Sequence, residues 1–453
     1  MKTIITPLLF CMLFQFSFAT TYLETTPQQA VQRLVAAKAG DTVMLANGIY
    51  KDAVIKFSAN GTKEYPVVFI AQTKGKVFFE GNSTLSIAGK YIIVDGFTWQ
   101  NGGTGLNKQS VIEFKNSSDN VAFNCTLQNC MIDNYNNSDK AVDNKWVSVY
   151  GQNNIVSHCL LKAKDNLGAT LTVWLKDGEA ANHTIEYNYF LQRTNGANAD
   201  NGLESMRIGD SKTSMTNAYC TIQFNRFEEC DGEIEIISNK SCYNKYTGNT
   251  FYNCNGGLTL RHGNNCTVDG NYFFGVSKKR SYGIRVIGEN HTVINNYLYG
   301  LQGGPFDKFR APITLVNGLQ NSPVNGYFQV KNAIIKNNFI INCNGPAVRI
   351  GSGKKEATLA PHDIIIQDNI VYNDSILLNE LLMEVNPLAT KIHYKNNQFY
   401  GRQPAETGWV KQLEDLLQKK GEIYINTSQI QKYTLQSAKQ VGPEWMKNKK
   451  SNE

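Results

Sequence analysis

The chain repeats the phrase Thr221-Ile222-Gln223-Phe224-Asn225-Arg226-Phe227: β-forming residues, a polar residue, then Asn flanked by aromatic or apolar residues. Further copies are centred on Asn188, Asn249, Asn271, Asn296, Asn338, Asn369 and Asn397. Looser copies are centred on Asn124, on His158 and on Asp95-Gly96-Phe97. From Asn225 to Asn296 the steps are 24, 22 and 25 residues, and elsewhere they lengthen to between 28 and 42. The repeat therefore governs how the chain is organised.

A repeat in the low twenties with strand-like content predicts a solenoid, in which each coil buries its core against its neighbours. The segments between copies are short, rich in Val, Ile, Tyr and Phe, and separated by Gly and Asn turns. We therefore expect an all-β fold, a single-stranded right-handed parallel β-helix, with longer steps carrying surface insertions. One Asn per coil predicts an internal asparagine ladder. A β-sandwich with chance placement of Asn would not explain such regular spacing.

Solenoids need capped ends. Thr26-Pro27-Gln28-Gln29, followed by apolar residues as far as Val35, predicts an N-terminal capping helix that ends before Gly40. A strand is expected directly after it, at 42–45. Near the other end, 409–419 alternates apolar and charged residues at helical spacing. No Pro-rich or Ser-rich linker divides the chain, so residues 20–453 are expected to form one domain.

Residues 1–19 are predicted to be a secretory signal peptide. Lys2 gives a positive start, 4–18 is largely apolar, and Ser17-Phe18-Ala19 is a small-x-small cleavage site. No later stretch reaches the ~18 apolar residues of a membrane helix. We therefore expect a secreted or periplasmic protein with no membrane span.

Charge and cysteine content narrow the possible partners. The formal charge of +7 favours an acidic partner, and the lack of a basic run or arginine-rich arm argues against nucleic acid. Nine of the ten cysteines follow residue 19, an odd number with no zinc-type spacing. We interpret them as small buried hydrophobic residues. The charge thus leaves an acidic polymer or a membrane surface as possible partners, and we expect the chain to be a monomer.

Three charged segments on consecutive coils, 201–210, 231–241 and 257–264, interrupt the ordinary repeat. Glu233 and Glu235 lie two apart on a predicted strand, so both should project from one face while Ile234 and Ile236 point inward. Carboxylates this close suit Ca²⁺, and Asn201 could add an amide oxygen. The alternative is an acidic face in contact with water, which the nearby cations Lys240 and Arg261 disfavour.

Lys240 and Arg261 are 21 residues apart, about one coil, so they could lie side by side on neighbouring strands. A metal, a lysine and an arginine on one sheet suit β-elimination on a uronate, because removal of the C5 proton builds charge on the adjacent carboxylate. Lys240 fits the base if nearby cations favour its neutral amine. Arg261 would stabilise or protonate the leaving oxygen. His262 would share that role or orient the sugar, although a lone histidine can equally be structural.

The sequence resembles polysaccharide lyase family 6, the alginate lyases and chondroitinase B. The resemblance rests on the motifs at 233–241, 260–264 and 283–288 and on the N-terminal segment 38–50, and it extends to Val441-Gly442-Pro443 and Trp445. It implies a lyase with Lys240 as base, Arg261 as acid, and a calcium ion. The implied calcium ligands are Asn201, Glu233 and Glu235, and the implied substrate-binding residues are His262 and Arg285.

The family contains alginate lyases and a dermatan sulfate lyase, and the absence of a second large domain favours alginate as the substrate. A pectate-lyase-like enzyme is a further possibility. A different class, a non-catalytic β-helix that binds acidic glycans, explains the repeat and the charge equally well. It does not require Lys240 and Arg261 one coil apart beside an acidic pair.

Overall fold

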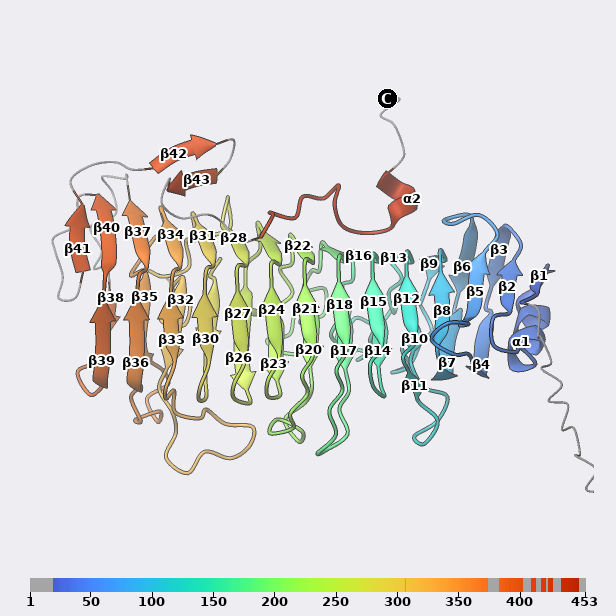
Figure 1. Ribbon diagram of the computed structural model, residues 1–453, viewed down its shortest axis with the longest axis horizontal. Helices are drawn as coiled ribbons and strands as arrows, with labels where there is room; N and C mark the ends of the chain where they lie inside the picture. Colours follow the sequence, from blue (N-terminus) through green and yellow to red (C-terminus); the bar gives the residue numbers. More distant parts are fainter. Residues whose placement is uncertain are drawn as a thin grey trace, which may run out of the picture.

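Three long parallel sheets wind around one elongated core (Figure 1). The computed structural model describes residues 19–305, 307–373, 383–401, 409–412, 417–420, 423–426 and 433–447. Successive strands of one coil enter sheets A, B and C in turn, and each strand pairs in parallel with its equivalent in the next coil. The predicted parallel β-helix is confirmed. Most of the predicted signal peptide lies outside the described residues.

In the described part of the chain, sheet A has 14 strands. They are β1 (Thr21–Glu24), β2 (Thr42–Leu45), β5 (Val67–Ala71), β8 (Ile92–Asp95), β12 (Thr126–Gln128), β15 (Ile155–Ser157), β18 (Thr184–Glu186), β21 (Thr221–Gln223), β24 (Lys245–Thr247), β27 (Thr267–Asp269), β30 (Thr292–Ile294), β33 (Ile334–Lys336), β36 (His362–Gln367) and β39 (Thr390–Lys395).

Sheet B also has 14 strands among the described residues. They are β3 (Gly48–Lys51), β6 (Val77–Gly81), β9 (Thr98–Gly102), β13 (Met131–Asp133), β16 (Leu160–Lys162), β19 (Tyr189–Leu191), β22 (Arg226–Glu228), β25 (Thr250–Tyr252), β28 (Tyr272–Phe274), β31 (Tyr297–Tyr299), β34 (Phe339–Ile341), β37 (Ile370–Asn373), β40 (Asn397–Gly401) and β41 (Trp409–Gln412).

Sheet C has 13 strands within the ranges described. They are β4 (Val54–Asn60), β7 (Thr84–Lys90), β10 (Ile112–Glu113), β11 (Ala122–Phe123), β14 (Val147–Val149), β17 (Leu171–Val173), β20 (Met206–Ile208), β23 (Glu235–Lys240), β26 (Gly257–His262), β29 (Ile284–Val286), β32 (Ile313–Val316), β35 (Val348–Ser352) and β38 (Met383–Val385).

The remaining elements lie outside the three sheets. They are α1 (Pro27–Val35), the antiparallel pair β42 (Leu417–Lys420) and β43 (Ile423–Asn426), and α2 (Glu444–Lys447). The predicted cap is confirmed: Thr26 and Gln29 form a capping box at the start of α1, and Ala30 and Leu34 are buried against the first coils. The helical interpretation of 409–419 is wrong, because β41 and β42 occupy its described part.

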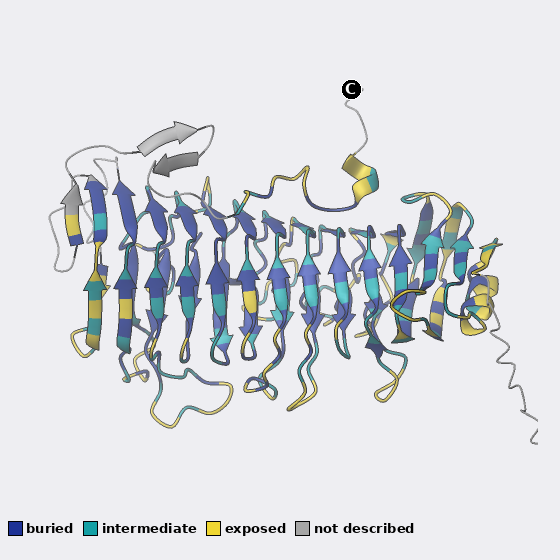
Figure 2. Ribbon diagram, viewed as in Figure 1, coloured by how far each residue is buried: buried dark blue, intermediate teal, exposed yellow. Residues whose placement is uncertain are grey.

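Equivalent side chains stack along the interior. Phe190, Phe227, Phe251 and Phe273 form one such column, with ring centroids 4.5–4.9 Å apart. Figure 2 shows the buried strands running through the length of the solenoid. The cysteines of the described chain are free and buried, as expected.

The asparagine ladder is present at the corner between sheets A and B. Each ladder amide donates to the side-chain oxygen of the next coil's asparagine, for example Asn249 to Asn271 at 2.9 Å and Asn271 to Asn296 at 3.0 Å. The same stacking continues through to Asn397, and these asparagines are fully buried. The looser copies centred on His158 and Asn124 were placed wrongly. At the ladder position of its coil, the backbone N–H of Cys159, not that of His158, donates to the Asn188 amide oxygen. Asn124 lies before β12, at another corner.

Replacing Asn271 with leucine is expected to lower the free energy of unfolding by about 1–3 kcal/mol. The change would leave the backbone and side-chain N–H groups of Asn249 and the carbonyl of Tyr246 without these hydrogen-bond partners. Urea unfolding measures the effect. Lys245→Leu, at an exposed strand position, serves as the control and should change stability by less than about 0.5 kcal/mol. An Asn271 variant as stable as the wild type would contradict a stabilising ladder.

A second buried polar column lies at the turn from sheet C to sheet A. His183 Nδ1 accepts from the backbone N–H of Asn154 at 3.0 Å, and Asn154 and Asn244 accept at the equivalent place in other coils. Burial lowers the pKa of His183 from its ordinary value of 6.5 to about 3. The imidazole is therefore neutral in the folded protein.

This buried imidazole predicts acid sensitivity. Below pH 6.5 the unfolded chain binds a proton that folded His183 does not, so stability is present above pH 6.5 and is lost as pH falls. We expect a loss of about 2 kcal/mol between pH 7 and pH 5 from this residue. His183→Asn should remove this contribution to the pH dependence of the unfolding free energy, as measured by urea unfolding at both pH values. An unchanged pH dependence in the variant would count against the assignment.

A C-terminal strap, residues 433–447, runs back along the outside of sheet B (Figure 1). Its backbone accepts from Tyr272 and Arg226, at the Tyr433 and Gln436 carbonyls respectively. Further along, Gly442 donates to the Tyr187 carbonyl, and Trp445 Nε1 donates to the Asn129 carbonyl at 2.8 Å. The strap thus joins coils from β28 back to β13.

Candidate active site

Lys240 and Arg261 lie at the ends of hydrogen-bonded neighbouring strands, β23 and β26, in sheet C. A register shift after Asn239 places Lys240 opposite His262 rather than opposite Arg261. The Lys240 and Arg261 side chains are 15% and 17% exposed, so both are partly covered and both reach solvent. The nearest carboxylate to the Lys240 amine is Glu204, at 4.0 Å.

The Arg261 guanidinium is held from several sides. Its Nη1 donates to His262 Nε2 at 2.9 Å and to the Gly326 carbonyl at 2.8 Å. The Tyr327 ring packs against it, 4.3 Å from the guanidinium carbon. Burial, with Arg261 and Lys240 nearby, lowers the pKa of His262 to about 4. A neutral His262 therefore accepts from Arg261 and orients it.

An acidic cluster of Glu204, Glu233 and Glu235 lies beside these cations. Burial, together with the charges of Glu204 and Glu235, raises the pKa of Glu233 to about 9. In the described chain, Glu204 Oε2 and Glu233 Oε2 are buried without a hydrogen-bond partner. Two such orphaned carboxylate oxygens are a place where a cation would restore lost interactions.

Glu235 is already engaged. It pairs with the Arg285 guanidinium, accepts from the Ser238 hydroxyl at 2.5 Å, and lies 3.9 Å from Arg261 Nε. The expected alternation of this strand holds only in part. Ile236 is buried in the core as predicted, but Ile234 is only half-buried. Glu233 precedes β23, and a bulge at Ile236 separates Glu235 from the regular pairing.

The donor types of this cluster fit calcium, which takes carboxylate and amide oxygens. Among the residues described, no three acidic, histidine or cysteine side chains converge closely enough to hold a metal. The Glu235 carboxylate is turned to Arg285. Asn201 is exposed on the turn before β20, so its place among the ligands stays a prediction. The available oxygens are those of Glu204 and Glu233.

Arg285 lies on β29, in register with Thr259 of β26, and its side chain is 4% exposed. Its guanidinium holds Glu235 and lies 5.7 Å from the Phe309 ring. The structure therefore gives Arg285 a clear role in positioning Glu235. Its predicted contact with substrate stays a prediction.

The chondroitinase B family model matches residues 25–441. The chain belongs to this family, polysaccharide lyase family 6. The solved family 6 alginate lyase AlyGC is 33% identical with a TM-score of 0.85, over 94% of this chain and 59% of AlyGC. A family 6 lyase from Pseudopedobacter saltans is 26% identical with a TM-score of 0.71, over 93% of this chain and 99% of that one. No curated protein sequence matches significantly.

This family 6 chain thus spans about three fifths of the length of AlyGC. No helix among its described residues is long and apolar enough to cross a membrane. The division into a signal peptide and one lyase domain stays a prediction.

Sequence reasoning missed three side chains of this family 6 site. Glu204 lies in one of the three charged segments, three residues after Asn201, and only its burial reveals its place beside Glu233. Arg207 on β20 has a buried Nε without a hydrogen-bond partner in the described chain. Tyr327 comes from the loop between β32 and β33, and no repeat marks it.

Proposed function

We propose that this chain is an alginate lyase that acts by β-elimination. The observation that carries the proposal is the pair Lys240 and Arg261 at the ends of adjacent strands, with Arg261 oriented by neutral His262 beside buried acids. The likeness to AlyGC, an alginate lyase, supports this choice of substrate. Family membership supports the reaction class.

In this mechanism the Lys240 amine takes the proton from C5 of the uronate at the cleavage point. The electron pair forms the C4–C5 double bond, and the C4–O glycosidic bond breaks. Arg261 donates to the leaving oxygen, which departs as a hydroxyl. Because His262 and the Gly326 carbonyl both hold the guanidinium, its donors are oriented before the substrate arrives.

Calcium is the proposed cofactor, held by Glu204, Glu233 and Glu235 with Asn201 as a further ligand. When bound it would neutralise the carboxylate charge that grows as the C5 proton leaves. The two orphaned carboxylate oxygens and the raised pKa of Glu233 support a cation here. Binding of Glu235 to calcium would compete with its pairing to Arg285.

A panel of substrates tests the function. Mannuronate-rich, guluronate-rich and mixed alginates, polygalacturonate and dermatan sulfate are each incubated with the protein. The unsaturated product is followed by its ultraviolet absorbance. We expect turnover of alginate. Turnover of polygalacturonate alone would overturn the proposal, and binding of alginate without any product would favour a non-catalytic glycan-binding protein.

Dermatan sulfate lyase is the second candidate. The match of the chondroitinase B model over residues 25–441 favours it. The same panel separates the two, because dermatan sulfate carries a sulfated amino sugar that alginate lacks.

For localisation we infer secretion or transfer to the periplasm from residues 1–19, and we propose a monomer.

A further inference from the structure

Asn201 and Gly202 form an Asn-Gly step on the turn between β19 and β20. The Asn201 side chain is exposed, and Gly202 has a φ of 86°, a conformation that favours glycine. Within the described ranges, no hydrogen bond holds the Asn201 side chain or the Gly202 backbone N–H. Because glycine has no side chain, the Gly202 nitrogen can approach the side-chain carbonyl carbon of Asn201 without steric hindrance.

This pairing of groups allows a spontaneous reaction of the main chain. The Gly202 nitrogen attacks Cγ of Asn201, the bond from Cγ to the side-chain nitrogen breaks, and ammonia leaves with the proton of the Gly202 amide. Water then opens the five-membered succinimide ring at either carbonyl. One product is aspartate and the other is isoaspartate, whose main chain runs through Cβ and Cγ and is one carbon longer. Either product carries a carboxylate where asparagine had a neutral amide.

The residues that follow this step are held tightly. The Gly202 and Glu204 carbonyls accept from backbone N–H groups of the preceding coil, at 2.8 and 3.0 Å. Leu203 and Glu204 are both 1% exposed. An extra main-chain carbon directly before this stretch therefore acts on Glu204, whose carboxylate belongs to the acidic cluster beside Lys240.

Two other Asn-Gly steps each lack one of these features. Asn60 is exposed, but the Gly61 N–H donates to a backbone carbonyl of β7 at 2.9 Å, so the attacking nitrogen is held. Asn195 is exposed on the same turn between β19 and β20, but its side chain donates to the Ala199 carbonyl at 2.8 Å and accepts from the Ala199 N–H at 3.0 Å. The reaction should be slower at both, because hydrogen bonds must open first.

We propose that Asn201-Gly202 is a site of spontaneous deamidation in the absence of calcium, and that bound calcium protects it. The inference rests on the proposed function for its calcium dependence, in which the Asn201 amide oxygen is a ligand. An amide held by the ion cannot turn toward the Gly202 nitrogen. Isoaspartate removes the amide and lengthens the main chain before Glu204, so the converted protein should lose lyase activity.

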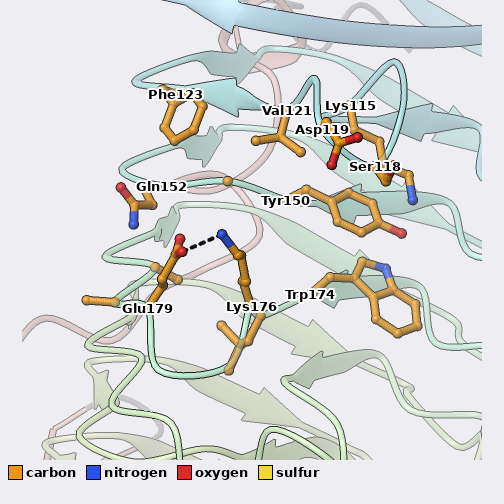
Figure 3. Close-up of a pocket in the computed structure, with 14 residues that line it drawn as sticks. Lys115, Ser118, Asp119, Val121, Phe123, Tyr150, Gln152, Trp174, Lys176 and Glu179 are labelled. Atoms are coloured by element: carbon orange, nitrogen blue, oxygen red, sulfur yellow. Dashed lines mark ion pairs between the residues drawn. The ribbon is translucent and has the colours of Figure 1, made fainter.

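The expected change is confined to the start of the sheet C strands. Asn201 precedes β20, whereas Tyr150 and Trp174 line a pocket of about 520 Å³ beyond the ends of β14 and β17 (Figure 3). Their rings are stacked with centroids 5.9 Å apart. The length of a strand separates this stack from the modified turn. The near-ultraviolet circular dichroism of the aromatic residues should therefore stay unchanged as Asn201 converts.

Peptide mass spectrometry on the full chain, stored at mildly alkaline pH with a chelator, measures the reaction. Asn201 should convert about ten-fold faster than Asn60 or Asn195, the factor expected from a hydrogen bond that must open. Calcium should slow conversion at Asn201 by about ten-fold and leave Asn60 unchanged. Equal rates at all three would overturn the deamidation site, and an Asn201 rate that calcium does not change would overturn the protection. Both readouts are masses, so they stand even if the protein cleaves no uronate.

Asn201→Gln is the matched variant, since glutamine keeps an amide but would have to close a six-membered ring, which is slower. Wild-type protein stored without calcium, then assayed on alginate with calcium restored, should lose activity in step with the converted fraction of Asn201. Asn201→Gln should keep whatever rate it has at the start. An equally fast loss in Asn201→Gln would overturn the link between conversion and activity.

Discussion

Replacing Lys240 with alanine is expected to lower kcat by about 10²–10⁴-fold while the protein stays folded. The loss follows from removing the group that takes the C5 proton. The side chain lies at the end of β23, and its nearest charged partner, Glu204, is 4.0 Å away, so its removal breaks no short ion pair. Initial rates on alginate, followed by the ultraviolet absorbance of the product, measure the effect.

Lys245→Ala is the matched control, because Lys245 is an exposed lysine on sheet A, only five residues further along the chain. It should retain the wild-type rate. Arg261→Ala should fall as far as Lys240→Ala, and Arg261→Lys should recover little, since an ammonium cannot reproduce the planar fork that contacts His262 and Gly326. Wild-type rates in Lys240→Ala with an unchanged melting temperature would remove this lysine from the mechanism.

Removing calcium is expected to lower activity by about 10²-fold or more, with recovery on adding Ca²⁺. The expected ion site is the acidic cluster, where, among the residues that the structure describes, Glu204 and Glu233 each have a buried carboxylate oxygen without a hydrogen-bond partner. Burial, with neighbouring acids, raises the pKa of Glu233 to about 9. Glu233→Gln should weaken the recovery by raising the Ca²⁺ concentration that it requires. Chelation followed by titration of Ca²⁺ against the initial rate gives this value.

Glu289→Gln is the control for the calcium series, because Glu289 pairs with Lys331 at the surface. Its calcium dependence should match the wild type. Elemental analysis of the protein as purified should find calcium. Full activity after exhaustive chelation, with no metal found, would mean that the acidic cluster acts through Lys240 and Arg285 alone.

The fold could be predicted from the sequence because each coil of a solenoid repeats the same residue pattern at a similar spacing. One buried Asn per coil has to meet the next one, so the spacing from Asn225 to Asn296 already implied stacked coils. The same logic placed Lys240 and Arg261 on neighbouring strands. Both results depend on local periodicity, which a single sequence contains.

The differences between the predicted and the observed site come from features that do not repeat along the sequence. The bulge at Ile236 moves Glu233 off the strand, and no residue pattern marks a bulge in advance. Tyr327 reaches Arg261 from a loop more than sixty residues away in sequence. The pairing of Glu235 with Arg285 depends on the rotamer of a buried carboxylate. Periodicity thus placed the elements of the site, while the contacts that orient each side chain required coordinates.

The C-terminal strap changes how this solenoid should assemble. Coils that touch only their neighbours can add one at a time as the chain is made. The strap adds contacts between residues more than 300 positions apart, such as Trp445 with Asn129. Such distant pairs close late, because a long loop must be ordered first. The strap therefore joins the stack late: coils from β13 to β28 can stack during synthesis, but the strap ties them together only after residues 433–447 have been made.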